Sequence, residues 1–184
     1  YVATPHAQHH EFVRQCLEAG KPVLCEKPLV PNLAQGRSLV ELATRNNVFL
    51  MEAVWTRFLP VYDTVASWLR NDAIGPVRAI QSSFCFSAPF EPAGRHYNPA
   101  LAGGALLDLG VYSIATTRWV IRQAVGACPE PSSIHASGTL APTGVDQRVS
   151  AMLTFPGGLS SQFVCAFDGS AEHSMTLLVE RGYI

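Results

Sequence analysis

A lysine and a tyrosine in this sequence are of the types that handle a proton beside an alcohol. Lys27 stands in the triplet Glu26-Lys27-Pro28, and Tyr112 follows Asp108 by four residues. A tyrosine is a usable general acid when a cation lowers its pKa from about 10, and an ammonium can be that cation. Hydride transfer between an alcohol and a nicotinamide needs a group that takes or returns the hydroxyl proton. The pair therefore predicts an oxidoreductase site, with Asp108 orienting the tyrosine or binding a substrate hydroxyl.

Each member of this pair also has a purely structural interpretation. Lys27 can be a surface lysine in a turn, paired with Glu26. Tyr112 can lie on a half-buried helix face, with Asp108 near the helix N-terminus, where the helix dipole favours an acid. Motifs this short often match by chance. The chemical interpretation therefore depends on whether Lys27 and Tyr112 meet over one cleft.

The first 56 residues alternate short apolar runs with helical patterns. We expect strands at 1–3, 22–25 and 48–51 and helices at 9–19 and 33–45. Strands that are apolar on consecutive positions indicate a parallel sheet with helices on both faces. Ligands of such sheets bind at the carboxyl ends of the strands, and Lys27 follows one of these ends directly. Pro28 restricts Lys27 to an extended backbone and helps to aim it into the crevice.

The pattern changes after residue 56. Helices are expected at 58–70 and 104–122, a strand at 77–86, and a loop rich in Pro, Gly and aromatic residues at 87–101. Four alternating segments, 134–140, 147–155, 159–167 and 174–179, predict an antiparallel meander. We therefore expect an α/β part over 1–56, the end of a doubly wound parallel sheet. An α+β part over 57–184 should follow, with a mostly antiparallel sheet and helices on one face.

Two further groups of side chains are candidates for binding. Aromatic walls with a few polar groups suit a small ring or a sugar. Such a wall, or ordinary core, is expected from Trp55, Arg57, Phe84, Phe86, Phe90, Arg95, His96 and Tyr97. His6, His9 and His10 lack the Glu of the H-E-x-x-H motif and any further ligand that the sequence places, so no metal is expected. Gly103 and Gly104 would let a backbone or a cofactor ring approach the start of the long helix.

Composition excludes several classes of protein. With 48% apolar and 15% charged residues, the 184-residue chain suits a packed core. The net charge of -1 and the lack of a basic stretch argue against nucleic acid or a membrane surface as partner. No apolar run approaches the roughly 18 residues that span a bilayer. Five cysteines, none separated by two residues, predict a reducing cytoplasm. The start at Tyr1 and the strand-like end predict an internal fragment.

The ordered motifs resemble the glucose–fructose oxidoreductase and inositol dehydrogenase (Gfo/Idh/MocA) family. The run Val2-Ala3-Thr4-Pro5 with His9-His10-Glu11, followed by Glu26-Lys27-Pro28, resembles its first signature. The segment 98–112, which contains Ala102-Gly103-Gly104 and ends in Asp108-Leu109-Gly110-Val111-Tyr112, is similar to its second signature. The segment 52–58, EAVWTRF, is most similar to the dihydrodiol dehydrogenase branch. The resemblance covers essentially the whole chain.

The resemblance implies a Rossmann domain, a sheet domain that binds substrate, and NADP or NAD as cofactor. It implies that Lys27 sits by the nicotinamide ribose, that Tyr112 is the general acid/base and that Asp108 lies in the active site. Cofactor contacts are implied for Thr4, Pro5, His9, Glu26, Lys27, Pro28, Trp55 and Arg57. Substrate contacts are implied for Lys27, Trp55, Phe84, Asp108 and Tyr112. A polyol, sugar or cyclic diol is the expected substrate, and a homodimer through the C-terminal sheet is the expected assembly.

The sequence departs from the family pattern in three places. Ala102 stands where the family commonly has a third glycine, and many members have His where Tyr112 stands. No G-x-G-x-x-G occurs, so roughly 60–70 residues of the nucleotide-binding domain, at about 30 per βαβ unit, are expected to be missing. That half chooses between NAD and NADP, and without it this polypeptide should not bind cofactor tightly. A nucleotide-sensing protein of the same fold and a mere interaction domain remain as alternatives.

Overall fold

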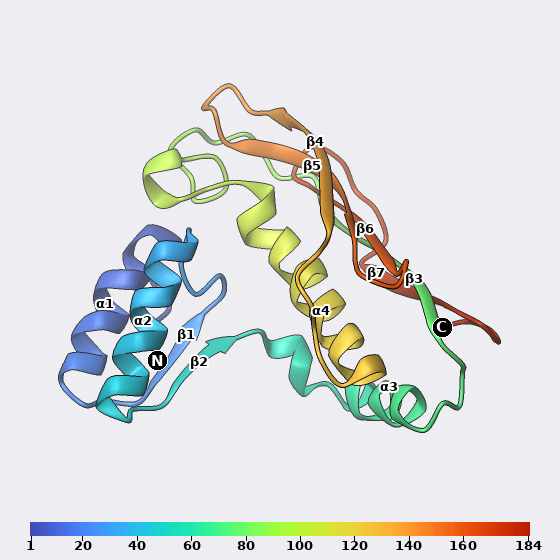
Figure 1. Cartoon of the computed structure of the whole chain (residues 1–184). Coiled ribbons are helices and arrows are strands. Elements are labelled where there is room, and N and C mark those ends of the chain that lie inside the picture. Colours follow the sequence, from blue (N-terminus) through green and yellow to red (C-terminus); the bar gives the residue numbers. More distant parts are fainter.

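The first part of the chain is a small parallel sheet with two helices. A computed structural model describes all 184 residues (Figure 1). Strand β1 (Val23–Glu26) pairs in parallel with β2 (Leu50–Ala53), and Val2 forms a parallel bridge to Cys25. Helices α1 (His6–Glu18) and α2 (Leu33–Asn46) pack together beside these strands. The predicted succession of strands and helices is thus confirmed, although the first strand is only a bridge at Val2.

Both helices lie on the same side of the two strands in Figure 1. The sequence pattern predicted the end of a doubly wound sheet with helices on both faces, and the part of that sheet in this chain carries its two helices on one face (Figure 1). The physical reason is the handedness of parallel crossovers. Two successive right-handed crossovers that step across a sheet in the same direction place both helices on one face. The shared core contains Val13 and Leu17 of α1, Leu39 of α2 and Cys25 of β1, all fully buried.

The second part is built on a mixed sheet of six strands in the order β4-β5-β6-β3-β7-β8. The strands are β3 (Val77–Cys85), β4 (Ser133–Leu140), β5 (Asp146–Thr154), β6 (Ser160–Ala166), β7 (Ser174–Val179) and β8 (Gly182–Tyr183). Strand β3 pairs in parallel with β6 and antiparallel with β7. The prediction of a mostly antiparallel sheet is confirmed. The uninterrupted meander is wrong, because β3 lies between β6 and β7. Alternation identifies the buried face of a strand but not its neighbour.

Helices α3 (Pro60–Arg70) and α4 (Val111–Val125) cover one face of this sheet (Figure 1). A buried cluster that includes Leu69, Ile80, Val120 and Leu177 joins them to the strands. Helix α3 starts at Pro60, a residue that suits the first helical position because its missing N–H would have no partner there. The 3-10 turn η1 (Trp55–Phe58) precedes it, so the helix expected from residue 58 begins later.

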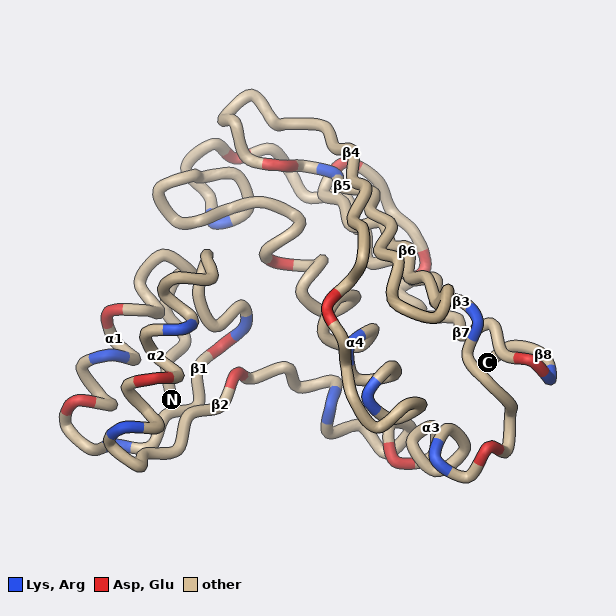
Figure 2. The backbone as a smooth tube through the Cα atoms, viewed as in Figure 1, with Lys and Arg blue, Asp and Glu red and all other residues tan.

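The expected helix 104–122 starts irregularly. The 3-10 turn η2 (Pro99–Leu101) comes first, and the π-helical turn η3 (Leu106–Gly110) then leads into α4. The run Pro99–Val125 is long and apolar enough to span a membrane by length and composition, so the expectation that no run reaches that limit is wrong. Core helices of water-soluble proteins meet the same criteria, and here Trp119, Val120 and Ile121 pack into the core beside the sheet. Figure 2 shows acidic and basic positions interspersed along both parts of the chain.

Candidate active site between the two sheets

An ion pair joins the end of β1 to the start of the long helix. Lys27 Nζ lies 2.6 Å from Asp108 Oδ1 and also donates to the Asp108 backbone carbonyl. The two side chains are 13% and 6% exposed, respectively. Lys27 follows β1, whereas Asp108 lies in the π-helical turn, 81 residues further along the chain. The two halves of the sequence therefore meet at the candidate site.

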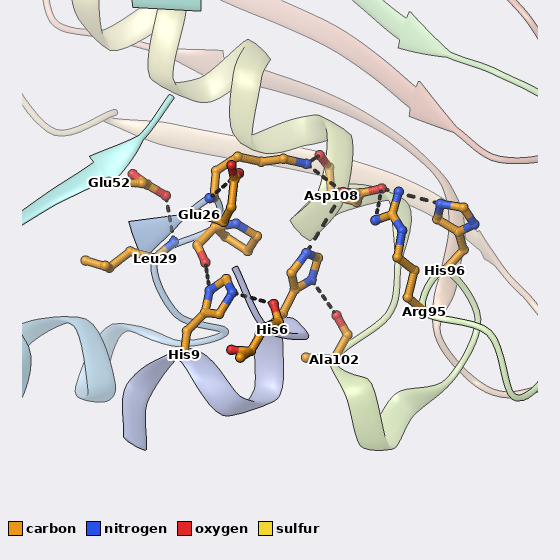
Figure 3. A network of polar contacts seen from close by, with 12 residues as sticks. His6, His9, Glu26, Leu29, Glu52, Arg95, His96, Ala102 and Asp108 are labelled. Carbon is orange, nitrogen blue, oxygen red and sulfur yellow. Dashed lines mark hydrogen bonds and ion pairs between the residues drawn. The ribbon is translucent and has the colours of Figure 1, made fainter. Parts of the chain in front are cut away.

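Asp108 is surrounded by nitrogen atoms (Figure 3). Arg95 Nη1 lies 3.2 Å from Asp108 Oδ2, and His96 Nε2 lies 3.8 Å from the same oxygen. His6 Nε2 lies 3.9 Å from Oδ1. Burial alone would raise the pKa of Asp108, but the charge and hydrogen bond of Lys27, together with Arg95, hold this pKa below its ordinary value. Asp108 is therefore an ionised acceptor at neutral pH and not a proton donor.

The two histidines beside this carboxylate are poor cations. Burial is the main cause that lowers the pKa of His6, and its hydrogen bond to the Ala102 carbonyl does not offset this effect. Burial, followed by the charge of Arg95, also lowers the pKa of His96. Lys27 and Arg95 thus supply the positive charge around Asp108, while His6 and His96 supply neutral polar edges.

Tyr112 borders the same ammonium through its ring. Lys27 Nζ lies 5.0 Å from the centroid of the Tyr112 ring, within the range of a cation–π contact. Burial raises the pKa of the Tyr112 phenol, and the neighbouring Trp55 acts in the opposite direction. The condition named from the sequence, a cation that lowers this pKa, is therefore not met, because burial is the largest cause and raises it. The phenol is therefore protonated at neutral pH and can donate a proton.

A cavity of about 410 Å³ opens beside Lys27 and Asp108. Its walls include Thr4, Pro5, His6, His9, Glu26, Lys27, Arg95, Leu101 and Asp108. The cavity lies at the carboxyl ends of the parallel strands, where such sheets bind ligands. The Thr4 hydroxyl is buried there without a hydrogen-bond partner. An unpartnered hydroxyl beside an ion pair suits the ribose or amide of a nicotinamide nucleotide, so the residues present fit the cofactor end that the sequence predicted.

The remaining predicted site residues divide into those beside this cavity and those away from it. Phe84 packs against Tyr112 with 5.3 Å between ring centroids, and Trp55, which is 59% exposed, neighbours the same phenol. Pro28 is buried behind the cavity and accepts a hydrogen bond through its carbonyl. Arg57 instead lies over the rings of Tyr62 and Trp119, outside the cavity. Its predicted cofactor contact has no support from its position.

The other aromatic candidates mainly build the wall behind the site. Tyr97 is core, and Phe90 packs against it at 5.0 Å between ring centroids. Phe86 contacts His96 and Phe167, at 5.8 and 5.4 Å between centroids. No group of three His, Cys, Asp or Glu side chains could hold a metal ion.

Sequence reasoning missed Asp146, which fixes the start of the helix that carries the site. Asp146 Oδ2 accepts the Leu106 backbone N–H at 2.6 Å, across 40 residues of sequence. A Cβ on Gly104 would lie 2.4 Å from Asp146 Oδ1, and a Cβ on Gly103 would lie 2.7 Å from the His96 carbonyl oxygen. The predicted close approach of a backbone is confirmed at Gly103. At Gly104 it is a carboxylate that approaches. The glycine pair was the only sequence signal of these contacts.

Comparisons with known proteins identify the family of this chain. Residues 1–54 match the family described as "Oxidoreductase family, NAD-binding Rossmann fold", and residues 62–184 match the "GFO/IDH/MocA C-terminal domain". The chain is 38% identical over 182 residues to trans-1,2-dihydrobenzene-1,2-diol dehydrogenase from Sus scrofa, covering 99% of this chain and 52% of that protein. The Xenopus laevis protein of the same name is 42% identical over 157 residues, covering 85% and 46%. The chain thus spans about half the length of these relatives.

Solved structures show the same arrangement. Aldose-aldose oxidoreductase from Caulobacter crescentus, complexed with glycerol, is 28% identical and superposes with a TM-score of 0.86, covering 100% of this chain and 54% of that chain. A 3-ketoreductase from Actinomadura kijaniata, in complex with NADP and TDP-benzene, is 27% identical with a TM-score of 0.81, covering 98% and 54%. With a matching family over most of its length and relatives above 30% identity, the chain belongs to the Gfo/Idh/MocA oxidoreductase family.

Proposed function

We propose that the protein carrying this chain is an NAD(P)-dependent oxidoreductase. It transfers a hydride between nicotinamide and a secondary alcohol or carbonyl of a sugar, cyclitol or cyclic diol. The observation that carries the proposal is the convergence of Lys27 and Tyr112. The Lys27 ammonium lies 2.6 Å from Asp108 Oδ1 and 5.0 Å from the Tyr112 ring, beside a polar cavity at the end of β1.

Each side chain has a task that follows from its surroundings. Asp108 stays ionised and fixes the Lys27 ammonium, whose one remaining donor can hold a substrate oxygen or a ribose hydroxyl. Tyr112 keeps its phenol proton at neutral pH and donates it when a carbonyl is reduced. In the oxidation direction the phenolate, which is the minor form at neutral pH, takes the hydroxyl proton. Bound nicotinamide supplies or accepts the hydride.

The choice of substrate class has two supports. The site combines polar groups around Asp108 with the aromatic rings of Phe84 and Tyr112, a combination that suits a ring carrying hydroxyls. The relatives named above are a diol dehydrogenase, an aldose oxidoreductase and a 3-ketoreductase. The family description of residues 1–54 supports NAD or NADP as cofactor.

The test uses the full-length natural protein that contains residues 1–184. Turnover of a panel of sugars, polyols and cyclic diols is followed by the absorbance of NAD(P)H. General acid–base catalysis contributes about 10²- to 10⁴-fold, so Tyr112→Phe should lower kcat by that factor. Lys27→Met should also abolish most turnover. Matched controls are Tyr183→Phe, at a tyrosine that is 79% exposed, and Lys21→Met, at an exposed lysine. Cofactor binding without turnover on any substrate would favour the nucleotide-sensing alternative and overturn this proposal.

The proposal extends to assembly as a homodimer through the face of the mixed sheet opposite α3 and α4. This face carries a hollow of about 640 Å³ whose lining includes Gln81, His135, Ser150, Met152 and Gln162. Met152 is exposed within it. Met152→Glu should shift the mass measured by light scattering from dimer to monomer. Val125→Glu, at an exposed apolar residue outside the hollow, should leave the mass unchanged.

Two further parts of the proposal are organisation and location. We place the boundary between the nucleotide-binding and substrate-binding parts at residues 56 and 57. Limited proteolysis should cleave near this boundary before it cleaves either sheet.

A cytoplasmic location fits the five cysteines, none of which forms a disulfide in this structure. Cell fractionation with an antibody to the protein tests the location.

A further inference from the structure

His9 is a fully buried histidine whose two ring nitrogens face backbone carbonyls. Its relative exposure is 0%. Nδ1 lies 2.8 Å from the Pro28 carbonyl oxygen, and Nε2 lies 2.8 Å from the Thr4 carbonyl oxygen (Figure 3). Both partners can only accept hydrogen bonds. The mechanism described above does not use this side chain, although it borders the cavity beside Lys27.

A neutral imidazole cannot satisfy both contacts. It carries one N–H, so the other nitrogen would turn its lone pair toward a carbonyl oxygen at hydrogen-bond distance. Rotating the ring by 180° does not remove the conflict. The rotation would place ring carbons near the two oxygens, at a separation well below the roughly 3.3–3.6 Å of C–H···O contacts. With a proton on each nitrogen, both contacts become ordinary hydrogen bonds of charge-assisted strength.

We propose that His9 carries both ring protons in the working protein and is a positioning residue that ties the Thr4 loop to the Lys27-Pro28 loop. The two loops follow neighbouring strands of the parallel sheet, Val2 and β1. The bond to Pro28 fixes the residue directly after Lys27, and therefore the base of the side chain that reaches Asp108. This inference deepens the proposed function and rests on it, because it assigns a task relative to Lys27.

The nearest histidine does not repel a positive charge on His9. The titratable groups near it are His6 on the same helix, Glu26 and Lys27 at the end of β1, Glu52 on β2, and Arg95 and Asp108 from the second part. Burial is the main cause that lowers the pKa of His6, so this neighbour is neutral and does not repel His9. Glu52 anchors the same loop from the other side, since its Oε1 accepts the Leu29 N–H at 2.7 Å.

The decisive experiment is nitrogen-15 NMR of the histidine rings in the full chain, with His9 assigned by through-bond correlation. We expect both His9 nitrogens to show the protonated signature at pH 7, whereas one protonated and one lone-pair nitrogen would overturn the proposal. This readout needs neither cofactor nor turnover. Dehydrogenase activity can therefore fail while the His9 result stands, and the His9 proposal can fail in an active enzyme.

A kinetic arm separates positioning from simple loss of structure. His9→Gln, measured in the full-length holoenzyme, should lower kcat about 10²-fold, the size expected when a catalytic group is displaced by about 1 Å. The control is His10→Gln, because His10 lies on the same helix and contacts only Ser38, at 3.0 Å. A folded His9→Gln protein with the wild-type kcat would contradict the positioning role.

Discussion

Replacing Gly104 with alanine should destabilise the start of the helix that carries Asp108 and Tyr112. Gly104 has φ of +122°, a conformation that residues with a side chain rarely adopt. Its added Cβ would lie 2.4 Å from Asp146 Oδ1, so the carboxylate that caps Leu106 would have to move. The backbone strain costs about 1–3 kcal/mol, and the loss of a capping acceptor costs about 0.5–2 kcal/mol. Together they predict a loss of roughly 1.5–5 kcal/mol in the free energy of unfolding for Gly104→Ala.

The assay is urea unfolding of the purified chain, followed by tryptophan fluorescence. Gly126→Ala is the matched control, because Gly126 also has a positive φ, +78°, while its Cβ would meet nothing within 4 Å. This control should lose only about 1–2 kcal/mol, the cost of a left-handed conformation. The difference between the two variants therefore measures the contact with Asp146.

A double mutant completes the test. In an Asp146→Ala background the obstructing oxygen is gone, so Gly104→Ala should cost only its backbone strain, about 1–3 kcal/mol. The reasoning would be refuted if Gly104→Ala and Gly126→Ala lowered the free energy of unfolding equally. It would also be refuted if Gly104→Ala lowered it by the same amount with and without Asp146.

Three further predictions concern the charges of the site. Asp108→Asn should cost about 3–5 kcal/mol at pH 7, because the largely buried Lys27 loses its partner. The pKa of Asp108 is lowered in the folded chain, so its contribution is present above the unfolded value near 4 and is lost as pH falls through the folded value. The free energy of unfolding should therefore fall less steeply between pH 7 and pH 2 for Asp108→Asn than for the wild type. Burial raises the pKa of Tyr112, so an ultraviolet titration should show a phenol above the ordinary range that is absent in Tyr112→Phe. Trp55→Phe should raise this pKa further, because it removes the neighbour that lowers it.

The elements that position the site could largely be read from the sequence. Apolar runs and helical stripes predicted β1, α1 and α2 to within a few residues, and the Glu26-Lys27-Pro28 triplet marked the end of β1. These signals are local, since each depends on the periodicity of a single segment. The sequence predicted that Lys27 and Tyr112 meet, and Lys27 Nζ lies 5.0 Å from the Tyr112 ring; the ion pair of Lys27 with Asp108 was not predicted.

The parts that could not be predicted all depend on contacts between distant segments. The parallel pairing of β3 with β6 has no signature in either strand. Asp146 was missed because it caps a helix 40 residues away, and nothing in its own neighbourhood distinguishes it from a turn residue. The raised pKa of Tyr112 could not be predicted because it comes mainly from burial, and the sequence does not show how deeply the phenol is buried. Arg57 matched a motif but stacks on Tyr62 and Trp119.

The insertion of β3 between β6 and β7 has a consequence for synthesis on the ribosome. Strand β3 is made early, yet its two partners span residues 160–166 and 174–179, so it waits for about half of the chain to emerge. Until then α4 has no complete sheet to cover, and its apolar residues stay open to solvent. Such late, long-range pairing slows folding and leaves apolar surface exposed, which favours aggregation. Nascent chains that stop before residue 179 should therefore bind chaperones, while longer chains are released.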